Sequence, residues 1–421
     1  MRMTLRGARL VDASTDLPAG EVVVEDGVLA VVGARRDRAT GRGRDAQTSR
    51  HEVLVDATGA ILTPGFIDVH THGGGGYNLH TLDPDEILAY ARWAPRTGLT
   101  GFLIAIVGVP DQPPDGQLRA AVAACAAATA RANGGASGGA EPLGIFLEGP
   151  YISAARRGAH MASWLRLPDV EEINRLLEVC AGRLRLITLA PELPGAAPVI
   201  RRLVEAGVTV SIGHTDATYE QTLEAIQIGV THATHCCNAM RPLGHRDPGP
   251  LAAIAQSPEV LGEVIADGVH VHPAMLALLT KLLGPDRTII ITDALAGAGT
   301  NGAAFEFAGQ PAHVERGAAR LSDGTITGSV LTVDQALRNA VRMTGASLRE
   351  AVGMLTLNPA RAIHLDGRKG RLRAGYDADL LLWDADLTLQ ATFCRGELAY
   401  CAEAWRGRLG GSDELDADAA E

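Results

Sequence analysis

The sequence predicts an α/β protein built on a (β/α)8 TIM barrel, with a small β-sandwich-like domain formed by strands from both ends of the chain. Eight short apolar runs occupy the middle of the chain, each ending in polar or Gly-rich residues and most followed by a helix-like stretch. Further strand-like runs come before and after this region. The 421 residues and the apolar fraction of 46% suit a large barrel with a satellite domain.

The first sixty residues are expected to contribute strands to the small domain. β-branched runs at residues 5–11, 21–24 and 28–32 predict strands, and Asp26-Gly27 predicts the hairpin turn between the last two. The Arg-rich residues 35–50 are expected to form a mobile, solvated loop.

The barrel is expected to span residues 61–370. An Ala-rich helix at residues 116–131 and a Gly/Ser loop at 133–140 are expected between the second and third strands. The eight strands are expected at residues 66–69, 101–107, 143–147, 184–189, 208–212, 231–234, 262–266 and 288–291.

After the eighth strand, residues 305–327 are expected to form an inserted hairpin, with a turn at Ser322-Asp323-Gly324. Helices should resume at 333–343 and 347–355, and Asn358-Pro359 should open a further short helix.

The C-terminal region returns to strands. Runs at 379–383, 388–394 and 397–400 predict that residues 371–409 pair with residues 1–60 in one small β domain. The acidic tail at 410–421 lacks a hydrophobic pattern and is expected to be disordered.

The composition excludes several classes of function. A net charge of −11 argues against a nucleic-acid surface, although one local Arg could still hold an anionic small substrate. No apolar run is long enough to span a bilayer, and the N-terminus lacks an apolar signal core. These two features lead us to expect no membrane partner. Because the six cysteines show no disulfide-framework or zinc-ribbon spacing, we also expect a cytoplasmic protein.

Six candidate metal ligands fall at or just past the ends of predicted strands. A TIM barrel builds its site on that face, because the strand ends converge there. Imidazole and carboxylate groups together bind zinc-like divalent ions and leave a coordination position for water. The six residues are His70, His72, Glu148, His214, His235 and Asp293.

These residue types predict metal-dependent hydrolysis of an amide. A bound divalent ion lowers the pKa of water to about 7, and a free carboxylate beside it can take the proton and pass it to the leaving amine. Asp293, in Ile-Ile-Thr-Asp-Ala, is the candidate for that role. We expect one or two ions per subunit, zinc in the first place, with iron or manganese as alternatives.

Taken singly, each residue has a structural alternative. A His-x-His pair on a strand can be structural, Glu148 could cap the next helix, and His214 could be a buried core histidine. Six such residues at five strand ends are much harder to explain in that way, so we favour the metal site.

Nine motifs match a known family. They are PGFIDVHTHG at 64–73, FLEGPY at 146–151, RGAH at 157–160, IGHT at 212–215, THCCNAM at 234–240, RDPG at 246–249, ADGVH at 266–270, TDA at 292–294 and TGS at 327–329. The first motif is shared widely across the superfamily, whereas Leu-Glu-Gly-Pro, His-x-x-Asn-Ala-Met and Asp-Gly-x-His are more specific. With these motifs the chain resembles the amidohydrolase superfamily and, within it, the N-acetylglucosamine-6-phosphate deacetylases.

The resemblance implies roles for the metal ligands. Glu148, His214 and His235 would bind the principal metal, with Glu148 standing where many relatives carry a carboxylated lysine. His70 and His72 match the members that hold a second metal. Asp293 resembles the family's general base and acid.

The resemblance also implies a phosphorylated N-acetyl amino sugar as substrate, with deacetylation of N-acetylglucosamine 6-phosphate to glucosamine 6-phosphate and acetate. His160 would polarise the acetamide carbonyl as a second catalytic residue. Asn238 and Ala239 would offer backbone N–H groups to the sugar phosphate, and Arg246 a charge-assisted pair. Because this Arg can come from a partner subunit in related enzymes, a homodimer is expected. The remaining pocket residues would be Ala159, Asp267, Gly268, Val269, His270, Ile326, Thr327 and Gly328.

Departures from the family pattern leave alternatives open. Met161-Ala162-Ser163 replaces the usual Asn or Asp and Pro after His160, and Arg241 adds a charge near the expected phosphate site. N-acetylgalactosamine 6-phosphate is therefore an alternative substrate. A deaminase or cyclic-amide hydrolase is a second alternative, and a non-catalytic binding barrel is a third. The phosphate-site residues argue against the second, and the intact ligand set with Asp293 against the third.

Overall fold

A computed structural model describes residues 2–34, 52–107, 115–133, 138–300, 302 and 304–409. The expectations for the Arg-rich loop at 35–50 and for the acidic tail at 410–421 lie outside the described residues.

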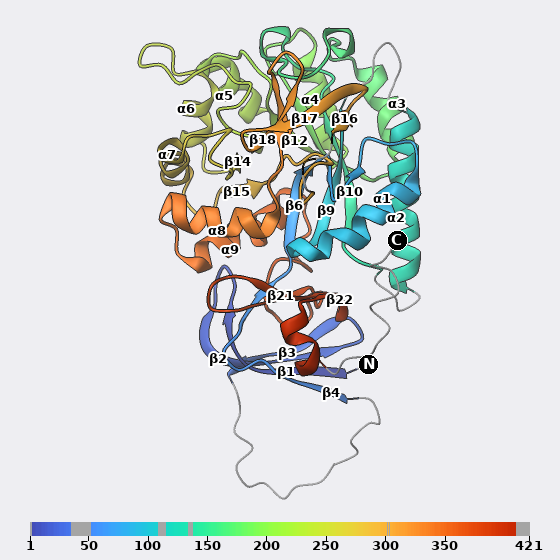
Figure 1. The fold of residues 1–421 in the computed structure, drawn as a ribbon. Helices are drawn as coiled ribbons and strands as arrows, with labels where there is room; N and C mark the ends of the chain where they lie inside the picture. The colour runs from blue at the N-terminus through green and yellow to red at the C-terminus, as the bar shows by residue number, and fades with distance from the viewer. Residues whose placement is uncertain are drawn as a thin grey trace, which may run out of the picture.

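Eight parallel strands form the central sheet, and neighbours in the sheet are neighbours along the chain (Figure 1). The two end strands meet where the backbone N–H of Asp293 donates to the carbonyl of His70 at 2.9 Å. The predicted (β/α)8 barrel is confirmed, and each predicted apolar run overlaps a strand, although Val208, Thr231, Thr234 and Ala266 fall just outside the observed bounds. The strands are β6 (Phe66–Thr71), β9 (Leu99–Val107), β10 (Glu141–Glu148), β11 (Leu184–Leu189), β12 (Thr209–Ile212), β13 (His232–Ala233), β14 (Leu261–Ile265) and β15 (Thr288–Ile291).

Helices surround the barrel, and several of them begin at a capping side chain. The side chains of Asp83, Asp169, Thr218 and Ser347 accept hydrogen bonds from backbone N–H groups in the first turns. The α-helices are α1 (Pro84–Trp93), α2 (Asp115–Asn133), α3 (Val170–Cys180), α4 (Ala196–Glu205), α5 (Tyr219–Gln227), α6 (Gly249–Gln256), α7 (Pro273–Leu283), α8 (Val333–Thr344), α9 (Leu348–Leu355) and α10 (Leu357–Ala362). Short 3-10 helices cover Ala94–Thr97, Ala154–Arg156, Ala162–Trp164 and Glu403–Arg408. No helix among the described residues is long and apolar enough to cross a membrane.

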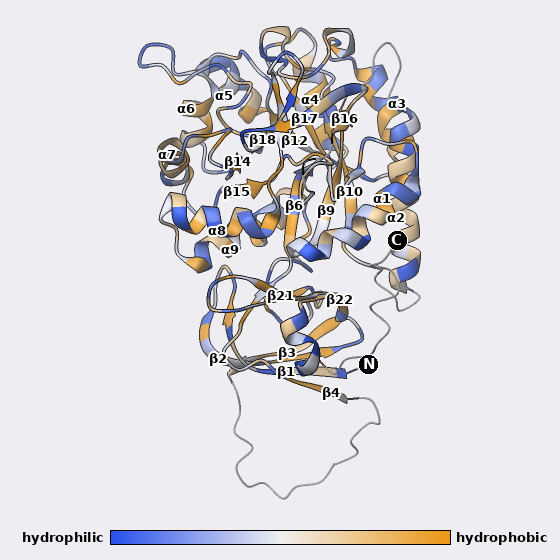
Figure 2. Ribbon diagram, viewed as in Figure 1, coloured by the Kyte–Doolittle hydropathy of each residue, from blue (hydrophilic) through white to orange (hydrophobic). Residues whose placement is uncertain are grey.

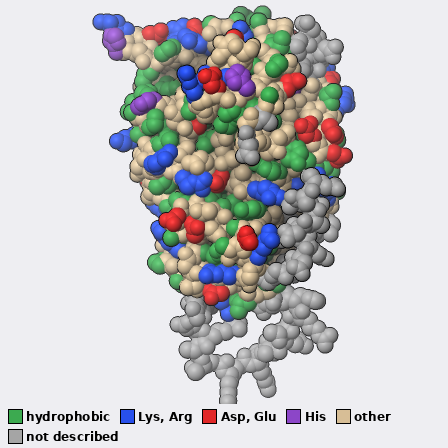
Figure 3. Space-filling view, in the orientation of Figure 1, with side chains coloured by type: hydrophobic (Ala, Val, Ile, Leu, Met, Phe, Trp, Pro, Cys, Tyr) green, Lys and Arg blue, Asp and Glu red, His purple; other side chains and the backbone are tan. Residues whose placement is uncertain are grey.

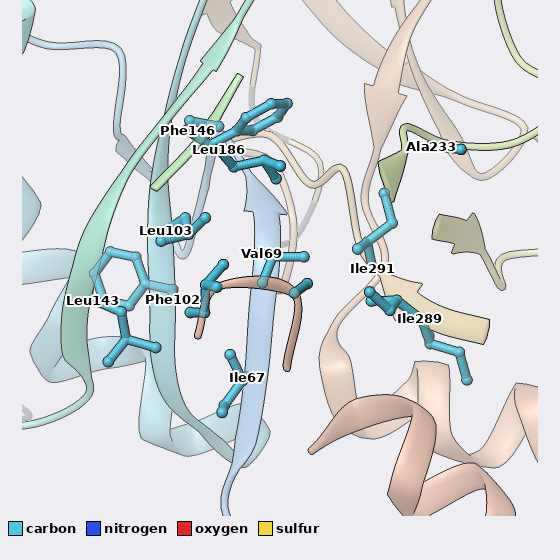
Figure 4. Packing of buried hydrophobic residues seen from close by; sticks show 14 of the residues in the cluster. Ile67, Val69, Phe102, Leu103, Leu143, Phe146, Leu186, Ala233, Ile289 and Ile291 are labelled. Carbon is cyan, nitrogen blue, oxygen red and sulfur yellow. The ribbon is translucent and has the colours of Figure 1, made fainter. Parts of the chain in front are cut away.

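The barrel core consists of side chains from the strands and from the inner faces of the helices. Figure 2 shows hydrophobic residues along the barrel strands, and hydrophobic and hydrophilic residues alternating along the surrounding helices. On one side, Ile67 and Val69 of β6 lie near Phe102 and Leu103 of β9 (Figure 4). Strands of a parallel barrel are covered on both faces, which explains why they appear in the sequence as continuous apolar runs.

A mixed eight-stranded sheet combines both ends of the chain below the barrel in Figure 1. β5 pairs with β20, where Ile61 lies opposite Trp383, so the predicted association of N- and C-terminal strands is confirmed. Asp26 and Gly27 both have positive φ at the predicted hairpin turn. The strands are β1 (Arg2–Val11), β2 (Asp16–Glu25), β3 (Val28–Ala34), β4 (Glu52–Asp56), β5 (Ile61–Pro64), β20 (Leu380–Trp383), β21 (Leu389–Cys394) and β22 (Glu397–Cys401).

This mixed sheet has a hydrophobic cluster separate from that of the barrel, with Leu5, Leu10 and Phe393 among its members. We propose that the sheet and its cluster form the small domain. Because β5 pairs within the mixed sheet, the proposed boundary falls after Pro64 and not before Ile61.

The insertion after β15 differs from the single hairpin predicted for it. It is a four-stranded antiparallel sheet of β16 (Phe305–Phe307), β17 (Gln310–Glu315), β18 (Ala318–Leu321) and β19 (Ile326–Ser329). The additional turns are Ala308-Gly309 and Arg316-Gly317, where both residues have positive φ. Such two-residue turns join very short strands, which the sequence pattern did not separate.

Candidate active site

The barrel brings the six predicted ligands together at the C-terminal ends of its strands. His70 lies in β6, Glu148 is the last residue of β10, and the others follow their strands within two residues. All six are buried. His214, His235 and Asp293 have φ of 46°, 27° and 48°, in the left-handed region that non-glycine residues seldom adopt. Such backbone strain is typical of sites where the fold fixes a side-chain direction.

Glu148 lies at the centre of the cluster. Its Oε1 is 3.0 Å from His214 Nε2 and 3.2 Å from His235 Nε2. Its Oε2 is 3.3 Å from His72 Nε2 and 3.6 Å from His160 Nε2. One carboxylate therefore faces imidazoles from several strand ends.

Asp293 lies beside the His-x-His pair. Its Oδ1 is 3.4 Å from His70 Nε2 and 3.4 Å from His72 Nε2. His70, His72 and Asp293 have ligand atoms within 4.8 Å of one another, and so do Glu148, His160 and His214. The cluster therefore contains two neighbouring sets of three donor groups, and each set could hold an ion.

The hydrogen bonds around the imidazoles favour a cation at their centre. His214 Nδ1 donates to the carbonyl of Arg156 at 2.8 Å, so the lone pair of the neutral ring lies on Nε2. That Nε2 is only 3.1 Å from His235 Nε2. Two ring nitrogens and a carboxylate at these distances form a donor set that suits a divalent ion, and a carbonyl partner on the second ring nitrogen is typical of metal-binding histidine.

The protein also holds its central carboxylates in the charged form. Burial alone would raise the pKa of Glu148, but the charge of His70 and hydrogen bonds from nearby imidazoles keep this pKa well below its usual range. Burial likewise opposes ionisation of Asp293, and His70 and His72 keep the pKa of Asp293 below its usual value. Both groups are therefore anionic at neutral pH, as ligands or proton acceptors must be.

A pocket of about 220 Å³, open to solvent, lies over the cluster. Eight of the residues predicted to contact substrate line this pocket, together with Gly158 and Phe307, which the sequence analysis did not identify. The eight are Ala159, His160, Asn238, Ala239, His270, Ile326, Thr327 and Gly328.

Four of the residues predicted to contact substrate lie outside the pocket lining, and three of these are consecutive, Asp267 to Val269. Asp267 Oδ2 accepts a hydrogen bond from His270 Nδ1 at 2.6 Å, and its Oδ1 accepts from the backbone N–H of Val269 and of His270. Asp267, Gly268 and Val269 therefore form the turn that presents His270, instead of the pocket wall itself.

Arg246 is also outside the pocket lining. It is exposed, and its guanidinium lies 2.6 Å from His245 Nε2. Arg241, the extra charge near the expected phosphate site, binds Asp216 at 3.1 Å and Asp247 at 2.8 Å. Arg241 therefore holds the loop of Arg246 in place and is itself already paired.

The Amidohydrolase family profile matches residues 61–403, which include the barrel and all three C-terminal strands, β20 to β22. The chain belongs to the amidohydrolase family. This family is metal-dependent, in agreement with the two groups of candidate ligands.

Relatives of this amidohydrolase include sugar-phosphate deacetylases. The N-acetylglucosamine-6-phosphate deacetylase of Lysinibacillus sphaericus is 33% identical over 398 residues, which cover 94% of this chain and 98% of the relative. The N-acetylgalactosamine-6-phosphate deacetylase of Escherichia coli O157:H7 is 34% identical over 399 residues, which cover 95% and 100%. A structure of a variant N-acetyl-D-glucosamine-6-phosphate deacetylase from Mycobacterium smegmatis, in complex with N-acetyl-D-glucosamine-6-phosphate, aligns with a TM-score of 0.82 at 35% identity. That alignment covers 94% of this chain and 99% of the other.

The amidohydrolase also contains two buried acids at the site that sequence reasoning missed. Glu263 of β14 contacts His70 Nδ1 at 3.0 Å and the backbone N–H of His235 at 3.1 Å. Asp68 of β6 accepts from Thr292 Oγ1 at 2.5 Å and from the backbone N–H of His70 at 3.1 Å. The available signal was the same for both, a charged residue inside an otherwise apolar strand.

Proposed function

We propose that this amidohydrolase hydrolyses the acetamide of N-acetylglucosamine 6-phosphate to glucosamine 6-phosphate and acetate. The observation that carries the proposal is the position of Asp293 beside the ligand cluster, at the base of a pocket lined by His160, Asn238 and Thr327. The N-acetylglucosamine-6-phosphate and N-acetylgalactosamine-6-phosphate deacetylases, which align with this chain over almost their whole length, support a phosphorylated N-acetyl amino sugar as substrate.

Each residue would have a separate role in the reaction. A divalent ion held by this cluster would lower the pKa of water and polarise the acetamide oxygen. Asp293 would accept the proton from the attacking water and deliver it to the amine that leaves. His160, buried and lining the pocket, would donate a hydrogen bond to the oxyanion that develops from the carbonyl.

We propose zinc as the physiological ion, because imidazole and carboxylate donors suit it. Glu148, His214 and His235 would hold the principal ion, and His70, His72 and Asp293 a second. Elemental analysis of the purified protein, after exchange into metal-free buffer, tests this assignment. Stoichiometric iron or manganese in place of zinc would contradict it.

The galacto-epimer is the second candidate substrate, because the Escherichia coli N-acetylgalactosamine-6-phosphate deacetylase is as similar to this chain as the gluco-specific relatives. Acetate release from both epimers, measured as kcat/KM with one enzyme preparation, decides between them. We expect the higher value for the gluco-epimer, and a higher value for the galacto-epimer would overturn that choice. Activity on a nucleobase or cyclic amide, with none on either sugar phosphate, would overturn the substrate class.

We further propose that the protein acts as a homodimer in the cytoplasm. Arg246 is exposed outside the pocket of its own chain, a position from which it could reach the phosphate in a partner's pocket. The six cysteines are free, which supports a reducing compartment. Light scattering tests the dimer. If Arg246 acts across the interface, Arg246→Ala raises KM in a dimer whose mass is unchanged.

The outer surface supports a small-molecule partner over a nucleic acid. On the face shown in Figure 3, acidic and basic side chains are interspersed among hydrophobic ones. Phosphate backbones are bound by clustered Lys and Arg, and the net charge of −11 opposes such binding.

A further inference from the structure

Glu263 is a carboxylate fully buried in the middle of β14, between Gly262 and Val264. Its Oε2 accepts two hydrogen bonds, from His70 Nδ1 at 3.0 Å and from the backbone N–H of His235 at 3.1 Å. Its backbone carbonyl accepts a third, from the N–H of Cys236 at 2.8 Å. Glu263 thus fixes the ring of the candidate ligand His70 and the turn that carries the candidate ligand His235.

The hydrogen bond to Glu263 determines which ring nitrogen of His70 can offer its lone pair to an ion. A carboxylate can only accept, so Nδ1 carries the proton and the lone pair of the neutral ring lies on Nε2. His70 Nε2 has no hydrogen-bond partner among the described residues, and it lies 3.4 Å from Asp293 and 3.6 Å from Glu148. A lone pair facing two carboxylates is repulsive, so either a proton on Nε2 or a bound cation must lie among these groups, and a metal ion would take the place of that proton.

The same carboxylate holds His235 in its strained conformation. The backbone of His235 has φ of 27°, and its N–H would be buried and unpaired without Glu263. Because Oε2 receives both bonds, a movement of Glu263 would displace the candidate ligands His70 and His235 together.

We propose that Glu263 is a positioning residue for the half-site of His70, His72 and Asp293, and that this half-site holds a divalent ion tightly only while Glu263 fixes His70 and the turn at His235. The inference rests on the proposed metal-dependent function, which it extends to a residue outside the ligand set. A carboxylate behind a metal-binding histidine commonly changes affinity by about 10- to 100-fold.

A purely structural role is the alternative. Glu263 Oε1 lies 3.7 Å from His232 Nε2, so the carboxylate could serve mainly as the partner of that buried imidazole. In that case removal of Glu263 would lower the stability of the metal-free protein and leave its zinc affinity unchanged.

Zinc binding to the full chain separates the two roles. Wild type, Glu263→Gln and Glu263→Leu are stripped of metal, titrated with zinc against a competing chelator, and analysed for zinc per chain. Thermal unfolding of each metal-free protein is recorded in parallel. Thr209→Val is the matched control, because Thr209 is buried as the first residue of β12, and its hydroxyl donates to the carbonyl of Ala362 at 2.6 Å.

We expect wild type to bind two zinc ions. The Gln variant keeps an acceptor oxygen but loses the charge, so it should bind the second zinc ion about tenfold more weakly than wild type. The Leu variant also loses the acceptor, so its affinity for the second ion should fall about 100-fold or more. The control should bind zinc as wild type does, even if it unfolds at a lower temperature.

Unchanged zinc affinity in the Gln and Leu variants overturns the proposal, and so does a wild type that binds a single ion at every zinc concentration. If the Leu variant does not fold, the Gln variant alone decides, since affinity equal to wild type would exclude the role. Acetate release by the wild type is a separate measurement. If the wild type releases no acetate, the substrate assignment is wrong, but the zinc-binding result still tests the role of Glu263.

Discussion

At the scale of single residues, the site is organised around two anions with different surroundings. Glu148 is enclosed by imidazole nitrogens at 3.0–3.6 Å, whereas the carboxylate of Asp293 lies 3.4 Å from both rings of the His-x-His pair and borders the pocket. Glu148 therefore suits a permanent ligand, and Asp293 suits a group that exchanges a proton with substrate.

This difference predicts the effect of Asp293→Asn. The amide is isosteric but cannot accept and return a proton, so kcat should fall by about 10²- to 10⁴-fold. The free energy of unfolding should change little, and zinc at Glu148, His214 and His235 should remain bound. Steady-state acetate release and zinc per chain are the measurements.

Asp334→Asn is the matched control for this loss. Asp334 is an acid of the same size on α8, where it pairs with Arg338 at 2.6 Å, away from the pocket lining. Its substitution should leave kcat unchanged. Near-parental turnover in Asp293→Asn would show that another group moves the proton.

At the scale of elements, the inserted sheet of β16 to β19 forms one wall of the pocket. Phe307 at the end of β16 and residues 326–328 of β19 line it. The hydroxyl of Thr327 is buried there and has no hydrogen-bond partner among the described residues. A buried polar atom without a partner, facing a pocket, suits a contact with a bound sugar.

Thr327→Val therefore should weaken substrate binding without changing the chemical step. Loss of one hydrogen bond costs about 1 kcal/mol, so KM should rise about 5-fold with kcat nearly constant. Thr325→Val, in the same insertion but outside the lining, should leave KM unchanged. A fall in kcat with constant KM would instead assign Thr327 to the transition state.

The elements also show what the sequence could and could not predict. Most barrel strands were predictable, because they are local runs of apolar residues bounded by Gly or polar residues; β13, which contains only His232 and Ala233, is the exception. The proposed role of Glu263 was not predictable, because it depends on contact with His70, which lies 193 positions away along the chain. The extra strands of the insertion were missed because strands of three to six residues carry too little periodicity. Arg246 was identified from its motif, but only the fold shows that it lies outside its own pocket.

At the scale of the whole molecule, a buried ion network joins the barrel to the mixed sheet. Lys369 is 3% exposed and contacts Glu141 at 2.9 Å and Asp379 at 2.6 Å. Glu141 begins barrel strand β10, and Asp379 precedes β20 of the mixed sheet. Arg368 adds a second contact to Glu141, at 2.6 Å. The network thus fixes the small domain against the end of the barrel opposite the site.

The network predicts how stability depends on pH. Burial opposes the charge of Glu141, but Lys369 and Arg368 lower its pKa to about 2. A carboxyl whose pKa is lower in the folded state stabilises the protein above the unfolded pKa of about 4.3, and this contribution is lost as pH falls toward 2. Glu141→Gln should therefore lower the free energy of unfolding by about 2–3 kcal/mol at pH 7, and the difference from wild type should shrink steadily between about pH 4.5 and 2.

Urea unfolding over this pH range, with both proteins under identical metal conditions, measures the difference directly. Glu171→Gln on the exposed face of α3 removes the same charge without a buried partner and should give a small difference at every pH. A constant gap between Glu141→Gln and wild type from pH 7 to pH 2 would show that the pair stabilises through packing alone. A gap that closes toward pH 2 would show that attraction between ions, more than shape, holds the two parts of the chain together.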